Sequence, residues 1–343
     1  MAAENPVAPE SAVALDLALT ARCPLRCRFC SVAKTPVPEL PARTWRRVLS
    51  DLARLRPIAL ISLEGGEPLA RRDLPEVLAA SLEHAAQVKL VTSGALPLAA
   101  LPAELARHPA FTLEVSVDGP PAVHDFLRDG SCRAAWGFIR QALEQGIRLR
   151  LRSVVSVFNR GCLEDWLADL DRDLAWSAAP IGYRFDVLIA PETLQRCGGP
   201  LERQGLRTFD GRGLVPFPAE VLALYERLRG RRFRRLRFEQ TEPLRGCGAG
   251  RLPSISFDPS GMFSFCCEVP RGFGSILEVP AAECLAILDD RMRALPCRRC
   301  AHLRESRCDG CWTGQKCGLV GYWRAPDCAS LLAAADARAS ISN

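Results

Sequence analysis

Apolar positions follow two different spacings along roughly the first 190 residues of the chain. Short and nearly continuous apolar runs, which favour buried strands, occupy residues 12–23, 58–68, 88–94, 111–119, 148–156 and 181–190. Between them, apolar residues recur every three or four positions, as on amphipathic helices, in residues 44–57, 74–86, 101–109, 134–146 and 163–174. This regular alternation of strand and helix predicts a parallel α/β architecture.

The number of repeats narrows the choice of fold. Six strand–helix repeats are too few for a closed eight-fold barrel, so we expect an open, partial (β/α)6 barrel of the TIM type. Gly146 is placed to end the helix at 134–146. Five apolar residues share one face of the first predicted helix: Trp45, Val48, Leu49, Leu52 and Leu55.

After about residue 210 the alternation stops and the chain becomes rich in Pro, Gly and Cys. Residues 254–267 predict a short hairpin around a Pro-Ser-Gly turn, and residues 330–341 predict a terminal helix. We therefore expect an N-terminal tail at 1–12, the partial barrel at 13–215 and a cysteine-rich domain at 216–343.

Composition limits the class of protein. Nearly half of the 343 residues are apolar, yet no apolar run reaches the ~18 residues of a membrane span. The first 15 residues lack a signal-peptide pattern, so we expect a cytoplasmic protein without a membrane partner. The net charge of +6 comes mostly from arginine, with lysine only at Lys34, Lys89 and Lys316.

The densest basic run covers residues 227–238. We interpret it as a solvated helix or strand edge; a site for an acidic substrate or peptide segment is the alternative. Because no further basic stripe with interleaved aromatic residues accompanies it, a nucleic-acid partner is not expected.

Sixteen cysteines are far more than average, and a chain of this size without a signal peptide favours metal or cluster ligation over disulfides. Cys23, Cys27 and Cys30 form a C-x3-C-x2-C loop directly after the first strand. A structural zinc ion usually takes four protein ligands. A [4Fe–4S] cluster held by three thiolates instead leaves one iron open for an external ligand.

This loop, with Phe29 just before its last cysteine, resembles the radical S-adenosylmethionine (radical SAM) superfamily. The resemblance implies that the open iron binds the amino and carboxylate groups of S-adenosylmethionine. One electron from the cluster then cleaves the cofactor, and the 5′-deoxyadenosyl radical abstracts a substrate hydrogen. An external reductant such as flavodoxin or ferredoxin is also implied. The cofactor carries out the radical chemistry, and the protein orients the cofactor and excludes water.

Further strand ends carry the same resemblance. Residues 63–68, LEGGEP, resemble the GGEP motif, and residues 91–94, VTSG, resemble a Thr-Asn-Gly strand end with Ser in place of Asn. Residues 115–128 resemble an S-x-D-G-P…H-D…R stretch. In that stretch the resemblance implies that Ser116 contacts the cofactor carboxylate, and we interpret His124 as a structural residue rather than a base. Alternation sends Arg148, Arg150 and Arg152 to one face of the fifth strand, and Arg152 is the candidate partner of the cofactor carboxylate. The implied cofactor-binding residues are Phe29, Gly65, Gly66, Glu67, Pro68, Thr92, Ser93, Ser116, Asp118 and Arg152.

The C-terminal cysteines resemble the SPASM extension, which carries up to two auxiliary [4Fe–4S] clusters. Here the later run reads C-x2-C-x7-C-x2-C-x5-C, which departs from the usual C-x2-C-x5-C-x3-C and leaves the pairing open. The implied outer ligands are Cys297, Cys300, Cys308 and Cys328. The implied inner ligands are Cys247, Cys266 and Cys311, with Cys267 or Cys317 as the fourth. One auxiliary cluster instead of two, or a zinc ribbon from the two C-x2-C pairs, stays open.

The substrate is the least determined feature. Peptide-modifying members often begin with a leader-recognition domain of about 80 residues, and the first strand here starts near residue 13. We therefore expect a small natural-product intermediate, such as a sugar, aminocyclitol or nucleoside, that is oxidised, epimerised or decarboxylated. Cys197 is a candidate hydrogen donor for an epimerisation. The alternatives are a peptide or sulfatase maturase and a non-catalytic iron–sulfur or zinc module.

Overall fold

A single curved sheet organises the molecule. The computed structural model describes residues 12–30, 32, 36–187, 218–239, 252–265 and 272–294. Within them, nine strands lie in the order β7-β6-β5-β4-β3-β2-β1-β8-β9, and all neighbouring pairs are parallel except the β8–β9 hairpin. The strands are β1 (Val13–Thr20), β2 (Ile58–Gly65), β3 (Ala85–Thr92), β4 (Phe111–Ser116), β5 (Leu149–Val155), β6 (Ile181–Val187), β7 (Leu236–Phe238), β8 (Ser254–Phe257) and β9 (Phe263–Ser264).

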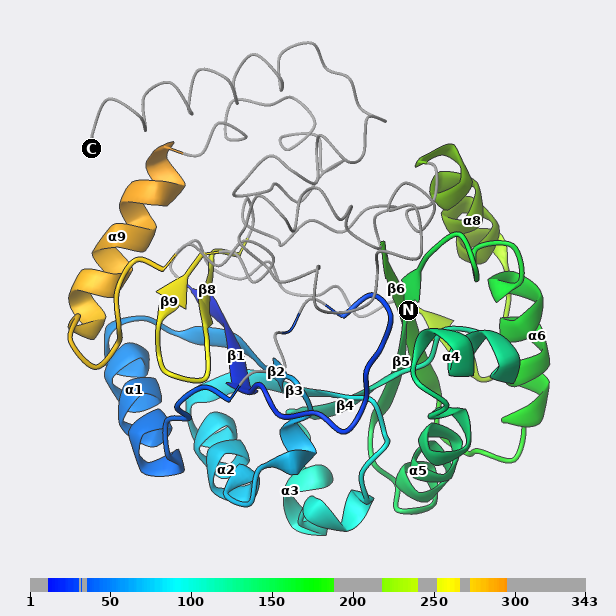
Figure 1. Cartoon of the computed structure of the whole chain (residues 1–343), viewed down its shortest axis with the longest axis horizontal. Helices are drawn as coiled ribbons and strands as arrows, with labels where there is room; N and C mark the ends of the chain where they lie inside the picture. Colours follow the sequence, from blue (N-terminus) through cyan, green and yellow to red (C-terminus); the bar gives the residue numbers. More distant parts are fainter. Residues whose placement is uncertain are drawn as a thin grey trace.

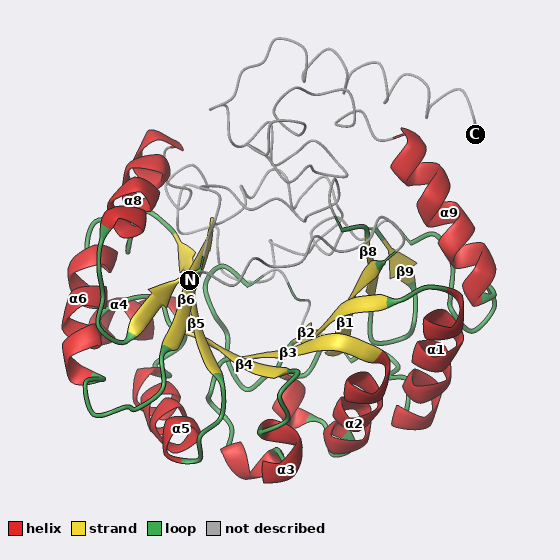
Figure 2. Ribbon diagram, turned by 180° about the vertical axis from the view of Figure 1, so that it is seen from behind, coloured by secondary structure: helices red, strands yellow, loops and turns green. Residues whose placement is uncertain are grey.

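Helices surround the strands on the outer side, as Figures 1 and 2 show from opposite sides. They are α1 (Ala42–Leu55), α2 (Leu74–His84), α3 (Ala103–Ala106), α4 (Pro121–Leu127), α5 (Cys132–Glu144), α6 (Leu163–Asp173), α8 (Pro218–Gly230) and α9 (Ala281–Ala294), with the 3-10 turns η1 (Pro68–Ala70) and η2 (Leu98–Ala100). Strands β1 to β6 follow one another in space as they do in sequence. The predicted partial α/β barrel is therefore confirmed.

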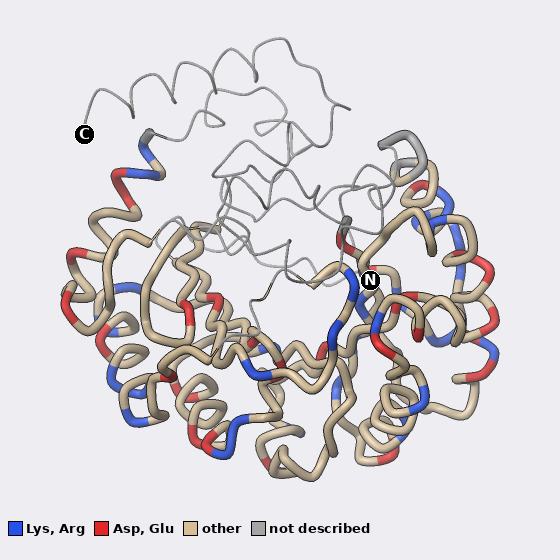
Figure 3. The backbone as a smooth tube through the Cα atoms, viewed as in Figure 1, with Lys and Arg blue, Asp and Glu red and all other residues tan. Residues whose placement is uncertain are grey.

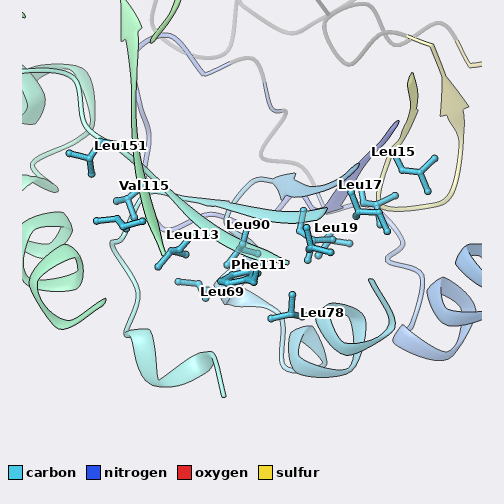
Figure 4. Packing of buried hydrophobic residues seen from close by; sticks show 14 of the residues in the cluster. Leu15, Leu17, Leu19, Leu69, Leu78, Leu90, Phe111, Leu113, Val115 and Leu151 are labelled. Atoms are coloured by element: carbon cyan, nitrogen blue, oxygen red, sulfur yellow. The ribbon is translucent and has the colours of Figure 1, made fainter. Parts of the chain in front are cut away.

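Alternation along the strands separates an apolar outer face from a polar inner face. Leu15, Leu17 and Leu19 of β1 are fully buried against the helices, and Figure 4 shows them beside the apolar residues of β3 and β4. Each such side chain contributes about 1.5–3 kcal/mol by leaving water. The intervening positions of β4, β5 and β6 carry charged residues, such as Glu114 between Leu113 and Val115, and these face one another on the inside of the barrel.

The predicted helix face of α1 is correct except at its end. Trp45, Val48, Leu49 and Leu52 are buried, but Leu55 is 54% exposed. Leu55 is the last residue of α1, and Arg56 after it is extended, so the chain leaves the sheet before Leu55 can pack. The predicted stop at Gly146 is confirmed, because this residue takes a positive φ of 71° after α5.

Segments beyond residue 215 extend the same sheet. β7 pairs with β6, and β8 pairs with β1 on its other side. The expected hairpin is present as β8 and β9. The domain boundary near residue 215 stays a prediction, and the terminal helix expected at 330–341 lies outside the described residues.

The basic run at 227–238 contains the end of α8 and the edge strand β7, as interpreted from the sequence. Arg227 and Arg231 each pair with Glu164 of α6, at 2.6 and 2.8 Å. Both signs of charge are spread over the outer helices (Figure 3). Within the described part of the chain, no helix combines the length and apolar character needed to cross a membrane.

Candidate active site

The three-cysteine loop leaves the C-terminal end of β1. Cys23, Cys27 and Cys30 are half-buried and form no disulfide bond. A tight turn brings the last two together, because the N–H of Cys30 donates to the carbonyl of Cys27 at 3.2 Å. The loop therefore presents three thiols from eight consecutive residues at the end of the barrel where α/β enzymes place their chemistry.

The segment after β4 holds this loop in place. The backbone N–H of Arg28 donates to the carbonyl of Leu127 at 3.0 Å, and its guanidinium donates to the carbonyl of Phe126 at 2.8 Å. The same guanidinium lies 4.1 Å from the centre of the Phe126 ring. The backbone N–H of Arg26 donates to the carboxylate of Asp129 at 3.0 Å. Residues about 100 positions later thus fix the loop between its cysteines.

The two glycines of the LEGGEP turn bring β2 against the start of the cysteine loop. A Cβ on Gly65 would lie 2.6 Å from the carbonyl oxygen of Thr20, and one on Gly66 would lie 2.3 Å from that of Arg22. The close approach lets Gly66 N–H donate to Thr20 at 2.7 Å and Glu67 N–H donate to Arg22 at 2.8 Å. The glycines were expected to admit a ligand; the contacts that require them here are within the chain itself.

Glu67 is a fully buried carboxylate with four protein donors. One oxygen accepts from the Thr92 hydroxyl at 2.8 Å and from Leu69 N–H at 3.2 Å. The other accepts from Ser93 N–H at 2.9 Å and from the Ser93 hydroxyl at 2.6 Å. Because a carboxylate offers about four acceptor positions, the four protein donors occupy Glu67, so that the sequence-predicted residues Glu67, Thr92 and Ser93 brace one another. The cofactor-binding role of this turn stays a prediction.

Asp118 and His124 meet directly after β4. Asp118 forms a buried ion pair with Arg128, and its other oxygen accepts from Val154 N–H at 2.7 Å. His124 Nδ1 accepts from Asp118 N–H at 3.3 Å, which leaves the Nε2 proton to donate to Ser131 at 3.1 Å. Burial, together with the charge of Arg128, lowers the pKa of His124 to about 4. His124 is therefore a neutral structural residue, as its place in the sequence motif predicted.

A network of charges lines the inside of β4, β5 and β6. The fully buried carboxylate of Glu114 lies 3.4 Å from Arg150, 3.4 Å from Arg152 and 3.9 Å from Arg184. Although burial alone would raise it, the pKa of Glu114 falls to about 2 because of these guanidinium groups and Lys89. Arg152 also pairs with Asp186.

The alternation expected for β5 is present at Arg150 and Arg152, whereas Arg148 precedes the strand. Arg152 is the middle residue of β5 and lies across from Ser116, the last residue of β4, in the register of the sheet. Arg148 is exposed and donates to the carbonyl of Pro109 at 2.6 Å. The cofactor-binding roles of Ser116 and Arg152 stay predictions.

Sequence reasoning did not single out Glu114, Arg184 or Asp186, and it gave Lys89 no role. Burial lowers the pKa of Lys89, which sits on β3 beside this network. The sequence pattern that could have identified these residues is a charged residue at every second position of an apolar run, as in residues 113–115 and 183–187.

The donor set of the cysteine loop fits an iron–sulfur cluster. Its three thiols can each bind a different iron of a [4Fe–4S] cluster and leave the fourth iron open. Among the described residues, no three Cys, His, Asp or Glu side chains lie close enough together to hold one metal ion.

The remaining predicted site residues divide into two groups. Phe29 lies under the Arg128 guanidinium, 5.1 Å from it, and Pro68 is buried at the start of η1. Ten of the singled-out cysteines lie outside the described residues: Cys197, Cys247, Cys266, Cys267, Cys297, Cys300, Cys308, Cys311, Cys317 and Cys328. Their roles stay predictions.

Comparisons with known proteins agree with this geometry. The model of the radical SAM superfamily matches residues 17–170. The chain is 40% identical over 87 residues to the PqqA peptide cyclase of Rhodopseudomonas palustris, covering 24% of this chain and 23% of that protein. It is 38% identical over 108 residues to the PqqA peptide cyclase of Streptomyces rochei, covering 30% and 29%. The chain thus aligns with about a quarter of the length of these relatives.

Solved structures show the same fold. SuiB of Streptococcus suis, bound to its precursor peptide SuiA, superposes with a TM-score of 0.58 at 16% identity, over 81% of this chain and 64% of that one. The protein named anSMEcpe, with bound AdoMet and a peptide, superposes with a TM-score of 0.59 at 14% identity, over 95% and 99%. Together with the three-cysteine loop, the family match identifies residues 17–170 as a radical SAM domain.

Proposed function

We propose that this protein is a radical SAM enzyme that modifies a peptide. The observation that carries the peptide class is the match to PqqA peptide cyclases at 38–42% identity. Two solved structures with the same fold hold a peptide, SuiA in one case and Cp18Cys in the other. These similarities do not support the sugar, aminocyclitol or nucleoside substrate expected from the sequence, and they favour the peptide alternative.

Each part of the site has a place in this proposal. When bound, a [4Fe–4S] cluster supplies one electron that cleaves S-adenosylmethionine and generates a 5′-deoxyadenosyl radical. Cys23, Cys27 and Cys30 would hold it. Glu67 keeps the ends of β2 and β3 together, so that the carbonyls of the LEGGEP turn face the cofactor. Arg152 of β5, which lies across from Ser116 at the end of β4, would pair with the cofactor carboxylate.

The inner charge network supports positioning rather than proton transfer. Glu114 carries a negative charge near neutral pH, since its pKa is lowered to about 2. Arginine side chains do not release protons in this range. These groups therefore supply a fixed field in which a substrate side chain can be oriented.

The auxiliary clusters and the reductant belong to the same proposal. Cys197 stays a candidate hydrogen donor for the case in which the reaction is an epimerisation. The cysteines at 247–328 would hold one or two further [4Fe–4S] clusters, with zinc as the competing metal. A flavodoxin or ferredoxin would deliver the electron. An auxiliary cluster can accept the electron left after hydrogen abstraction, so an oxidative cross-link fits a chain with such clusters.

Anaerobic reconstitution tests the enzyme class. The reconstituted protein is expected to contain about eight to twelve irons and to release 5′-deoxyadenosine when S-adenosylmethionine and dithionite are added. The Cys23→Ala, Cys27→Ala, Cys30→Ala triple variant should lose cleavage. A matched control changes three cysteines elsewhere in the described chain, Cys132, Cys162 and Cys284, to Ala and should keep it. Zinc in place of iron, or no deoxyadenosine from iron-loaded protein, would leave only a metal-binding module.

Mass spectrometry tests the peptide class. The probes are synthetic peptides for any short open reading frames found beside the gene, each incubated with reconstituted enzyme, S-adenosylmethionine and dithionite. A mass loss of two hydrogens, absent with the triple cysteine variant, supports an oxidative peptide modification. An unchanged peptide, with cleavage of S-adenosylmethionine accelerated by a small sugar or nucleoside instead, would return the function to the small-molecule class.

A further inference from the structure

Arg128 is a buried cation beside the three-cysteine loop. It caps the C-terminal end of α4 and is only 8% exposed. Its Nε donates to one oxygen of Asp118, and Nη2 lies 3.5 Å from the other. Because a buried charge is little screened by salt or water, this guanidinium acts on its surroundings more strongly than a surface arginine does.

The guanidinium faces the cysteine loop. It lies 5.1 Å from the centre of the Phe29 ring, and Phe29 stands between Cys27 and Cys30 in the chain. Burial pulls the pKa of Arg128 down, but the attraction of Asp118 and of the Cys27 thiolate outweighs it and raises the pKa above the ordinary value. The carboxylate of Asp118 also accepts a hydrogen bond from Val154 N–H of β5 at 2.7 Å, so Asp118 is tied to the sheet as well as to Arg128.

The backbone fixes the position of this charge. Arg128 N–H donates to the carbonyl of His124 at 2.7 Å. The next residue, Asp129, has a φ of 58°, the one positive φ among the non-glycine residues that the structure describes. That conformation is uncommon for a residue with a Cβ, and it lets the Asp129 carboxylate accept from Arg26 N–H inside the loop at 3.0 Å. Strain of this kind is kept only where the surroundings hold it in place.

We propose that the buried guanidinium of Arg128 sets the reduction potential of the cluster held by Cys23, Cys27 and Cys30. Reduction adds one electron from the external reductant to the cluster and moves no proton, so the cluster gains one negative charge. A fixed positive charge close to the loop stabilises that reduced form, and nearby charge is one of the determinants of cluster potentials. The inference rests on the proposed function, since it requires the cluster.

The experiment compares variants by redox titration. Reconstituted protein is poised at fixed potentials, and the reduced cluster is counted by EPR from the signal that changes when S-adenosylmethionine is added. Arg128→Met removes the charge, Arg128→Lys keeps it, and Asp118→Asn combined with Arg128→Met removes the whole pair. Arg26→Met is the matched control, because Arg26 is an exposed arginine inside the same loop.

Removing the buried charge should lower the ratio of reduced to oxidised cluster at a fixed potential by about tenfold, which is about 59 mV for one electron. Arg128→Lys and Arg26→Met should each stay within about threefold of the unchanged protein. The double variant should shift the ratio in the same direction but less than Arg128→Met, because it also removes the negative charge of Asp118.

Three outcomes overturn the proposal. Arg128→Met and the double variant could both stay within about threefold of the unchanged protein, or Arg26→Met could shift the ratio as far as Arg128→Met does. Loss of iron from both charge-removing variants, with iron kept by Arg128→Lys, would make Arg128 a brace of the loop and not a determinant of the potential. If the protein without substitutions binds no iron after reconstitution, the proposed function itself is wrong.

Discussion

Ser93 donates two hydrogen bonds to the carboxylate of Glu67, one from its backbone N–H at 2.9 Å and one from its hydroxyl at 2.6 Å. The pair joins the turn after β2 to the end of β3. Both strand ends lie at the carboxyl end of the sheet, where parallel barrels place their chemistry. The pair thus fixes the relative position of these two strand ends by a contact within the chain.

Glu67→Gln tests this brace. An amide places an NH2 group where the carboxylate accepted donors, so buried donors are left without acceptors. We expect a loss of about 2–3 kcal/mol in the free energy of unfolding and at least tenfold weaker binding of S-adenosylmethionine, measured by equilibrium dialysis. Ser93→Asn is the milder comparison, because it keeps the backbone N–H donor. Unchanged binding in Glu67→Gln would show that the turn holds its shape without the carboxylate.

Gly66→Ala should disrupt the approach of β2 to the cysteine loop. The new Cβ would lie 2.3 Å from the carbonyl oxygen of Arg22, a backbone atom that cannot swing away. We expect a lower melting temperature and less iron bound after reconstitution. Gly137→Ala is the matched control: nothing lies within 4 Å of its Cβ, and it sits inside α5. That change should stabilise the protein by up to about 1 kcal/mol. Equal iron content in the two variants would contradict the prediction.

Protonation of His124 should weaken the fold in mild acid. Burial and Arg128 lower its folded pKa to about 4, while Asp118 and Asp125 oppose the shift. In the unfolded chain the ring takes its proton near pH 6.5. The unfolded state therefore binds more protons below that pH, and stability falls as the pH drops from about 6.5 toward 4. We expect His124 to account for a loss of about 2 kcal/mol between pH 7 and pH 5.

Urea unfolding of the protein and of His124→Gln at both pH values checks this. Glutamine keeps a donor for Ser131 and does not titrate. The variant should be less stable at pH 7, and its stability should change less between pH 7 and pH 5. A pH dependence as steep as that of the unchanged protein would place the titrating group elsewhere.

Glu114→Gln should be among the most destabilising single changes on the inner face of the barrel. It removes the carboxylate that Arg150, Arg152 and Arg184 share, and so leaves only Asp186 and Glu239 to balance these three guanidinium groups. Breaking such a buried network costs about 3–5 kcal/mol.

The matched control for that change is Glu239→Gln. Glu239 also pairs with Arg150, at 2.6 Å, but its side chain is 39% exposed. A pair exposed to this degree is worth at most about 1 kcal/mol. Similar urea midpoints for the two variants would show that the inner network is solvated rather than buried.

The sequence predicted the six-stranded part of the barrel well because parallel strands covered by helices read as apolar runs. The charge network was not predicted, because its residues lie singly within these apolar runs. Glu114 sits between Leu113 and Val115, and its partners come from β5 and β6, so only the assembled sheet identifies them. The pairing of β8 with β1 joins residues about 240 positions apart, and no local pattern encodes such a contact.

Two features differ from the prediction, helix α4 and the exposure of Leu55, and the sequence holds information on both. Helix α4 has only seven residues, too few for a clear periodicity, although Pro121 at its first position is a known start signal. Leu55 has the right spacing for the core, but periodicity does not tell where a helix leaves its sheet. The brace from Phe126, Leu127 and Asp129 to the cysteine loop depends on tertiary contact alone.

The pairing of β1 between β2 and β8 has a consequence during protein synthesis. β1 leaves the ribosome first, but its partner β8 follows about 240 residues later. At the usual 5–20 residues per second, one edge of β1 stays unpaired for on the order of ten to fifty seconds. During that time the nascent chain carries an apolar strand edge, a template for aggregation, next to three oxidisable thiols. Folding yield in the cell should therefore depend on chaperones that shield this first strand until translation reaches residue 257.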